Sequence, residues 1–455
     1  MRRYSVLLIS AALICAPVSA ATGKGDATGS VYDAYEQKAA QSAAEAGDET
    51  VAGSIRAALR HNPGLRAASA QKDAAKAERF RALGGFLPDI EASASYTDNN
   101  WNSSPLPGQI PQDGTTVGVT AVQPVFQGLS ALNRFRAARS RVTQADLALL
   151  SAQQNTVLDA ARAHAGVILA RAIVAHRIEN MGLVSQQLVI AQKRQEAGAQ
   201  SRTGVEQARM RLAQAQVDLG QARTVLAEAE AAYVRIVGRS APETLEPDTR
   251  DIAAQFASLE EALTIARNSN PAIGSADAGV DAAERAKAAA VGDFAPRLTL
   301  EGRYFKRYGN DAILSGYEDE YQIVARMRMP ILRQGNDIAG LRAANATVSQ
   351  QEAQMTATVL AVEETVMRSW RQLAEAQARA AAAKTGIEAA KMAVRGLQME
   401  YDAGQRTVID VLDGQRDLVI AQINESQAEF EVRASQYELT AAAGVILDAY
   451  ADILN

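Results

Sequence analysis

The chain has 455 residues, a formal net charge of −5 and only 5% aromatic residues. This composition, which is rich in alanine, glutamine and arginine, indicates long helices rather than several compact domains with large aromatic cores. No basic stripe is concentrated anywhere along the chain, so nucleic acid is excluded as an expected partner.

The N-terminus predicts a secretory signal peptide over residues 1–20, because Arg2 and Arg3 precede an apolar run and small residues stand before Ala21. The only cysteine, Cys15, lies in this segment. Ile14 before it is a poor residue for a lipoprotein cleavage site, so a lipid anchor is the weaker alternative. The mature chain is then expected to contain no disulfide. Residues 21–53 lack periodic apolar spacing and are expected to form a mobile leader.

The rest of the chain repeats itself at a step of 206 to 208 residues. The matching motifs are Asn62-Pro63 and Asn270-Pro271, Phe86-Leu87-Pro88 and Phe294-Ala295-Pro296, Pro124 and Pro330, Gly198 and Gly404, and Gly238 and Gly444. A period of this length corresponds to a whole subdomain rather than to a solenoid unit. We therefore expect two tandem halves, residues 54–258 and 259–455.

Each half is expected to begin with two helices, broken at the Asn-Pro pair because the residue before proline avoids the helical region. A β-hairpin follows, over 88–124 in the first half and 296–330 in the second. Apolar residues alternate there with polar ones, and in the second half the polar face carries full charges. This alternation favours strands between lipid and a watery lumen. An ordinary soluble sheet with one wet face is the alternative.

Four strands cannot close a barrel, and an open edge in lipid would leave backbone groups unsatisfied. Three copies would supply about twelve strands, an even number with room for a lumen. The expected fold class is therefore an α+β membrane protein, in which four strands per protomer contribute to a trimeric, twelve-stranded outer-membrane β-barrel. A long coiled-coil α-helical barrel, built from the same two tandem repeats, is expected to continue it.

The helical part is predicted from two proline-free runs, residues 129–197 and 337–403, each of which would span about 100 Å at 1.5 Å per residue. Small residues at three- and four-residue spacing are typical of closely packed coiled coils. A shorter helix, expected at 203–237 in the first half, returns along the long one. A soluble coiled-coil rod would share this composition, but the hairpins and the signal peptide count against it.

Gly198 and Gly404 are expected to end the long helices, where a left-handed residue is needed. The next helix in each half should then start with a capping box, formed by Thr203 with Glu206 and by Thr407 with Asp410.

A second acid, Asp413, follows Asp410 at i+3 and shares its helix face, whereas its first-half counterpart is Gln207. In a trimer, three such pairs around one axis would form an acidic ring that attracts cations. A solvated acidic face is the alternative.

This region carries a family resemblance. The residues concerned are Tyr401-Asp402-Ala403-Gly404-Gln405-Arg406-Thr407-Val408-Ile409-Asp410-Val411-Leu412-Asp413 and Tyr437-Glu438-Leu439-Thr440-Ala441-Ala442-Ala443-Gly444. With these motifs the sequence resembles the TolC family of outer-membrane channel proteins, over essentially the whole chain from Ser54 onward. The resemblance implies a homotrimer that crosses the outer membrane and extends into the periplasm as a passive exit duct. A periplasmic adaptor and an inner-membrane transporter would recruit it, with an ABC-type transporter favoured and an RND-type one as the alternative.

The resemblance also implies roles for single residues. Asp410 and Asp413 look like the channel constriction. Tyr401, Arg406 and Thr203 look like the latch that closes the entrance. The adaptor-binding tip would comprise Gly198, Gly404, Gln405 and Arg406. One departure concerns Gly204, which stands where the family pattern has an acid opposite the tyrosine. The closed state would then be held differently, for example through Glu206.

Among functions, a channel for type I protein secretion is favoured, because Arg406-Thr407 followed by Asp-Val-Leu-Asp looks more like that branch. Multidrug or heavy-metal efflux is the alternative within the class, and a periplasmic coiled-coil adaptor or structural protein is a third hypothesis. An enzyme is not expected. His164 and His176 lie twelve residues apart on one helix, too far to share a metal, and His61 is explained by a helix end. The sequence predicts no metal site and no cofactor.

Overall fold

The computed structural model describes residues 49–98, 114–309, 317–331 and 333–450. The chain divides into Met1–Ala46 and Gly47–Asn455, and every described residue belongs to the second unit. The expected signal peptide, Cys15, residues 21–48 of the expected leader and the tips of both hairpins lie outside the described residues.

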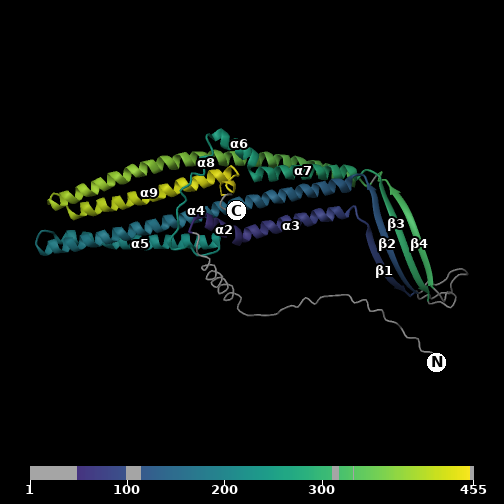
Figure 1. Ribbon diagram of the computed structural model, residues 1–455, viewed down its shortest axis with the longest axis horizontal. Coiled ribbons are helices and arrows are strands. Elements are labelled where there is room, and N and C mark those ends of the chain that lie inside the picture. Colours follow the sequence, from purple (N-terminus) through teal and green to yellow (C-terminus); the bar gives the residue numbers. More distant parts are fainter. Residues whose placement is uncertain (1–48, 99–113, 310–316, 332, 451–455) are drawn as a thin grey trace, which may run out of the picture. The chain divides into compact units, whose positions relative to one another are not determined.

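The two halves contain the same elements in the same order (Figure 1). The first half consists of α2 (Val51–His61), α3 (Pro63–Gly84), β1 (Asp89–Thr97), β2 (Gly114–Gln127), α4 (Ser130–Glu196) and α5 (Arg202–Val237). The second half consists of α6 (Leu259–Ser269), α7 (Pro271–Gly292), β3 (Arg297–Gly309), β4 (Tyr317–Arg328), α8 (Asn336–Asp402) and α9 (Val408–Ala442), followed by the 3-10 turn η2 (Asp448–Tyr450). The expected tandem architecture of helices, hairpin and paired long helices is confirmed.

The Asn-Pro pairs break the early helices as expected. Asn62 caps α3 by accepting a hydrogen bond from the Gly64 N–H at 2.7 Å, and Asn270 accepts one from Ala272 N–H at 2.9 Å. Helix α2 begins at Val51 rather than after residue 53, because Thr50 caps it and Val51 is buried in the core.

The four strands form one antiparallel sheet in the order β1-β2-β3-β4. Strands β2 and β3 belong to different halves, so their pairing joins the two hairpins into one sheet. Phe305 on β3 lies opposite Gly118 on β2, and a side chain at Gly118 would come within 2.2 Å of the Phe305 ring. This close approach explains the glycine. Among the described residues, no helix is both long and apolar enough to cross a membrane.

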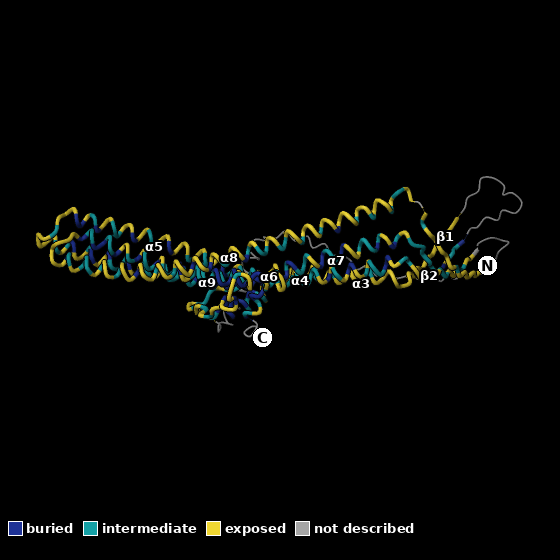
Figure 2. The backbone as a smooth tube through the Cα atoms, turned by 90° about the horizontal axis from the view of Figure 1, so that it is seen from above, coloured by how far each residue is buried: buried dark blue, intermediate teal, exposed yellow. Residues whose placement is uncertain are grey.

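The helical core is concentrated where the short helices α2 and α6 pack on the long ones, as Figure 2 shows by the gathering of buried residues. One cluster unites Ile55 of α2, Val157 of α4 and Tyr437 of α9. A second unites Leu263 of α6, Val366 of α8 and Leu439 of α9. Elsewhere the long helices bury mainly alanine and valine. The two clusters therefore hold half of the twelve largest fully buried side chains, among them Tyr450, Ile55 and Leu439.

The C-terminal turn η2 returns to this core through a carboxylate. Asp248 accepts hydrogen bonds from Arg250 Nε and from the Tyr450 hydroxyl, both at 2.9 Å. Burial alone would raise the pKa of Asp248, but the hydrogen bonds from Arg250 and Tyr450 outweigh it and hold the pKa below its ordinary value. Asp248 therefore remains charged and ties the segment between the halves to the end of the chain.

A buried polar network connects α2, α4 and α5. The Ser54 hydroxyl lies 2.9 Å from His164 Nδ1 and 2.8 Å from the Tyr233 hydroxyl, and His164 Nε2 lies 2.8 Å from the Glu246 carbonyl oxygen. A carbonyl only accepts, so Nε2 carries the proton and Nδ1 of the neutral ring accepts from Ser54. Ser54 in turn accepts from Tyr233. With His164 neutral, each of these three close contacts has one donor and one acceptor.

Burial lowers the pKa of His164, although the hydrogen bond to Glu246 and the charge of Asp248 oppose this effect; Arg239 adds to it. In the folded protein, His164 thus stays neutral at a pH where the same histidine in the unfolded chain, with an ordinary pKa of about 6.5, accepts a proton. The contribution of neutral His164 to the stability of the fold is therefore complete above that pH. It is lost as the pH falls toward the pKa of His164 in the folded protein.

We expect His164→Gln to lower stability at pH 7.5 by about 1–3 kcal/mol, because Ser54 loses its buried acceptor. The further loss of stability between pH 7.5 and 5.5 should be smaller in this variant than in the wild type. Thermal unfolding followed by circular dichroism at both pH values measures this, with His176→Gln on the same helix as the control. An unchanged pH dependence in His164→Gln would contradict the assignment.

Candidate functional site

The candidate site is formed by the two turns where the long helices reverse direction. Gly198 follows α4 with φ +73°, and Gly404 follows α8 with φ +78°. Both glycines therefore adopt the left-handed conformation expected at a helix end. Gln405 N–H then donates to the Glu400 carbonyl at 2.9 Å, and Ala199 N–H donates to Arg194 O at 2.8 Å. The two turns share one backbone geometry.

The two helices that follow these turns begin in different ways, and one prediction about their first residues was wrong. At α9 the capping box is confirmed, because the Asp410 carboxylate accepts from Thr407 N–H at 2.9 Å and the Thr407 side chain accepts from the Asp410 backbone N–H. The Thr407 hydroxyl also donates to the Asp410 carboxylate at 2.6 Å. At α5 the N-cap is Ser201, whose hydroxyl accepts from Gly204 N–H at 3.2 Å. Thr203 lies inside the helix.

The step of 206 residues explains this difference. It makes Ser201 the counterpart of Thr407, and Gly204 the counterpart of Asp410. Glu206 therefore stands beyond the capping position and instead pairs with Arg209 at 2.9 Å. Only the second half has an acid at the start of its return helix.

Tyr401 lies in an apolar cluster beneath both turns. Its neighbours are Val184 and Ala191 of α4, Val205 and Ala208 of α5, and Val408, Val411 and Leu412 of α9. The Arg194 guanidinium stacks over the Tyr401 ring, 4.3 Å from its centroid, and also pairs with Asp402 at 3.3 Å. Arg194 thus links the end of α4 to the end of α8. The Tyr401 hydroxyl is buried and has no hydrogen-bond partner among the described residues.

The two expected constriction acids have different surroundings. Hydrogen bonds from Thr407, and more weakly the charge of Arg406, lower the pKa of Asp410, which is partly exposed and charged at neutral pH. Asp413 lies further along α9, where its carboxylate accepts a 2.6 Å hydrogen bond from Arg211 of α5. In the single protomer, the negative charge of Asp413 is balanced by a cation from the other half.

The three expected latch residues are not brought together in the protomer. Tyr401 contacts Arg194, as described above, whereas Arg406 pairs with Glu400 at 2.8 Å. The hydrogen bond that Arg406 donates to the Glu400 carboxylate raises the pKa of Arg406. Thr203 is exposed, and its side chain makes no hydrogen bond within the described part of the chain. The latch and tip roles remain predictions, with Gly198, Gly404, Gln405 and Arg406 all lying at the two turns.

Sequence reasoning missed Arg194, Arg211 and Glu400, the residues that pair with the site. Arg194 and Glu400 lie at helix ends, where their charges could have been noted. Arg211 could not have been paired with Asp413 from local spacing, because the contact depends on which faces of α5 and α9 meet.

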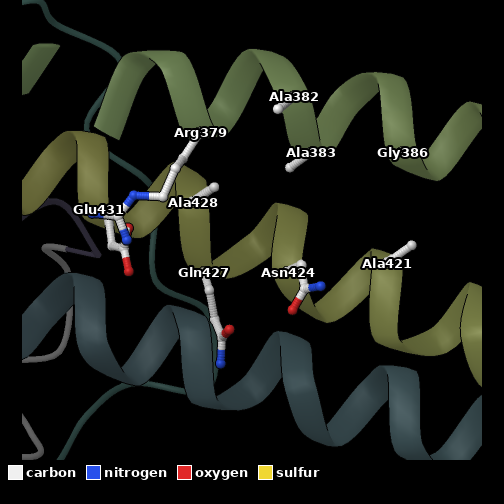
Figure 3. Close-up of a pocket in the computed structure, with 9 residues that line it drawn as sticks. All are labelled: Arg379, Ala382, Ala383, Gly386, Ala421, Asn424, Gln427, Ala428 and Glu431. Atoms are coloured by element: carbon white, nitrogen blue, oxygen red, sulfur yellow. The ribbon is translucent and has the colours of Figure 1, made fainter. Parts of the chain in front are cut away.

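A groove of about 430 Å³ runs between α8 and α9 away from the turns (Figure 3). Alanines and Gly386 line most of it, and Arg379 pairs with Glu431 at 2.9 Å. Gly386 stands sixteen residues before the end of α8, about 24 Å along the helix axis. Small side chains and a satisfied ion pair suit helix packing better than ligand binding. The described residues also include no group of His, Cys, Asp or Glu that could hold a metal ion.

Each half has a β-hairpin followed by two long antiparallel helices. The fold class is therefore a tandem repeat in which an open sheet is joined to a helical bundle. The profile of the outer membrane efflux protein family matches residues 54–239 and 262–445. The chain belongs to this family. The match covers both halves and both turns.

Individual relatives support this family assignment. The outer membrane efflux protein BepC of Brucella suis biovar 1 is 30% identical over 398 residues, which cover 87% of this chain and 85% of the relative. The outer membrane protein TolC of Vibrio cholerae is 25% identical over 397 residues, covering 86% and 89%. The solved structure of the outer membrane protein VceC from Vibrio cholerae shares the fold with a TM-score of 0.76 at 19% identity, over 87% of this chain and 96% of that one.

The capping box predicts different effects for two substitutions of one residue. Asp410→Ala removes the acceptor for Thr407 N–H, so amide exchange over the first turn of α9 should become severalfold faster. Asp410→Asn retains an acceptor oxygen and should change exchange less. Hydrogen exchange read by mass spectrometry measures both, and Ser201→Ala, which should affect only α5, is the matched control. Equal exchange in all three variants at α9 would show that the box contributes nothing.

Proposed function

We propose that three copies of this chain form an exit channel in the outer membrane, and that this channel is part of a tripartite export system. The observation that carries the proposal is the open sheet: in the described protomer, β1 and β4 each have a partner on one side only. Three such sheets joined edge to edge would give twelve strands and leave no free edge.

The side chains of the edge strands support a lipid-facing surface. Ile90 and Tyr96 on β1, and Tyr321, Ile323 and Met327 on β4, are all exposed in the protomer and stand at alternate positions. The intervening positions carry Glu91, Ser93, Arg326 and Arg328. One apolar and one charged face is the arrangement of a strand between lipid and a water-filled lumen. The long helices would continue the duct on the periplasmic side.

The turns after α4 and α8 would then surround the periplasmic entrance. Asp410, charged and partly exposed, would contribute to a constriction that attracts cations, and Asp413 would do so to the extent that its pair with Arg211 opens. Because Tyr401, Arg406 and Thr203 do not meet in the protomer, a latch made from them requires contacts between copies. An adaptor is proposed to bind at Gly198, Gly404, Gln405 and Arg406.

Type I protein secretion, with an ABC-type transporter, is the favoured assignment because of the sequence at the α9 turn. Drug or heavy-metal efflux, with an RND-type transporter, is the alternative, and it is supported by the efflux description of the family and of BepC. A periplasmic adaptor or structural rod is disfavoured because it would have no use for a charged and apolar sheet with two open edges.

The charge argument predicts a change in ion selectivity. Asp410→Asn combined with Asp413→Asn keeps side-chain shape and removes six carboxylate charges from a trimer. Cation selectivity in a planar lipid bilayer should fall, and conductance should rise if the acids also hold bound cations at the entrance. Glu206→Gln removes an acid from the neighbouring turn and is the control. Unchanged reversal potentials in the double variant would exclude an acidic constriction here.

Deletion of the gene separates the two transport assignments. For type I secretion we expect loss of at least one protein from the culture supernatant with unchanged susceptibility to dyes, detergents, drugs and metal salts. For efflux we expect hypersensitivity with an intact secretome. Complementation with the wild-type gene is the control. If neither phenotype appears and the protein does not fractionate with the outer membrane, the exit-channel proposal fails.

A further inference from the structure

A strap of chain, residues 239–257, runs from the first half to the second. Its first part, residues 240–247, contains no helix or strand and is attached to the first half by hydrogen bonds. These bonds join the Pro242 and Glu243 carbonyls to Arg171 Nη1 at 2.6 and 2.8 Å, the Glu246 carbonyl to His164 Nε2 at 2.8 Å, and the Glu246 N–H to the Glu49 carbonyl at 2.9 Å. Leu245 is the only large hydrophobic side chain in this part, and it is only partly buried. Backbone hydrogen bonds are therefore the main attachment.

The second part of the strap, from Asp248 onward, is anchored to the second half. The Asp248 carboxylate accepts a hydrogen bond from the Tyr450 hydroxyl at 2.9 Å, and Gln436 Nε2 donates to Asp251 at 2.9 Å. Phe256 is buried in the cluster formed by α6, α8 and α9. The strap therefore passes from one half to the other within a few residues, and its two parts are held by different kinds of contact.

His164 lies beneath the first part of the strap. Its ring is fully buried, whereas Glu246, the strap residue that it contacts, is exposed to water. A single stretch of irregular chain thus separates the imidazole from solvent on this side. On its other side are the hydroxyls of Ser54 from α2 and Tyr233 from α5, which are uncharged and fully buried.

The charges around His164 belong to the strap and do not overcome its burial. Burial disfavours the protonated ring most strongly, the hydrogen bond to Glu246 and the charge of Asp248 favour it, and the charge of Arg239 disfavours it, so that the pKa of His164 is lowered. The groups that already donate hydrogen bonds to Asp248 are Arg250, Tyr437 and Tyr450. The ring is therefore neutral as long as the strap covers it.

Lifting the strap is the least disruptive way to bring water to His164. Exposure through α2 would remove Ile55 from the core, and exposure through α5 would remove Tyr233 and Val237, all of which are fully buried. Exposure through the strap breaks the few backbone hydrogen bonds of its first part and moves only Leu245 among large hydrophobic side chains. Segments held by few buried apolar contacts open locally at a lower free energy than core helices do.

We propose that acid lifts the first part of the strap from α4, because His164 takes up a proton only after residues 240–247 have moved away and water can solvate the charged ring. In the lifted state the imidazole has the proton affinity of an ordinary histidine, with a pKa of about 6.5. Each unit of pH below that value should then raise the population of the lifted state by up to about tenfold. Every group in this switch belongs to one copy, so the inference does not depend on the proposed channel.

Hydrogen exchange read by mass spectrometry tests this on the full-length protein in mild detergent between pH 7.5 and 5.0, with rates corrected for intrinsic exchange. The Glu246 amide is the reporter, because it is bonded to Glu49 only while the strap is seated. We expect its protection to fall by up to about tenfold per pH unit below about 6.5. Peptides that cover Tyr233 on α5 and Ala199 at the α4–α5 turn should keep their protection.

Three variants separate proton uptake from a merely structural role. His164→Gln removes the titrating ring, so protection of the strap should no longer change with pH. Ser54→Ala disturbs the same network but keeps the histidine, and the pH dependence should persist. Arg171→Gln removes two attachments of the strap, so protection should be lower at every pH with an unchanged slope.

Strap protection that is independent of pH in the wild type, or that falls equally in His164→Gln, would overturn the inference. Loss of protection at Tyr233 together with the strap would also overturn it, since general unfolding would then expose the histidine. If His164→Gln does not fold, exchange of the imidazole C2 hydrogen of His164 in the wild type decides. A pKa below the ordinary histidine value supports the switch, and an ordinary value refutes it.

Discussion

On the outer side of β1 and on the outer side of β4, backbone N–H and C=O groups point away from the sheet and have no strand partner in the described protomer. Water can satisfy such groups, but a hydrocarbon environment cannot, and each one left unsatisfied costs several kcal/mol. Because β1 is nine residues long and β4 twelve, the two edges together present many such groups. In the proposed membrane setting, a sheet with an apolar face and two free edges would therefore be complete only when another copy supplies the missing strands.

The helical part depends on its neighbours for a different reason. Alanine is the commonest buried residue of α4, and a buried methyl group contributes little apolar area compared with a leucine or an aromatic ring. Large buried side chains gather instead where α2 and α6 meet the long helices, together with the hydrogen-bonded groups of Ser54, His164 and Asp248. Further along, single ion pairs such as Arg211 with Asp413 connect helices whose apolar contact is small. Such weak contacts suit helices that move against each other at an entrance.

The sequence was sufficient to predict the elements, because its signals are local. Asn62 and Asn270 before prolines, the left-handed Gly198 and Gly404, and the period-two alternation each specify a backbone conformation within a few residues. The long helices accordingly end within one residue of the predicted positions. The cap of α5 was predicted wrongly because Thr203 and Glu206 have the right spacing in the wrong register, and only the step of 206 residues identifies Ser201 instead. Pairs such as Arg194 with Tyr401 could not be predicted, since they depend on which faces of distant helices meet.

The two halves differ in the acidic residues at the start of their second long helices, and this difference limits how an entrance built from them could open. In the proposed trimer six helical turns would surround the axis, three after α4 and three after α8. Asp410 and Asp413 would occur only in alternate turns, because Gly204 and Gln207 take their places in the first half. Arg211 of the first half neutralises Asp413 within each copy, so separating α5 from α9 would both widen the gap between the turns and leave the Asp413 charge without its partner. Movement of the second-half helices alone would thus change the size and the charge of the entrance together, with threefold rather than sixfold symmetry.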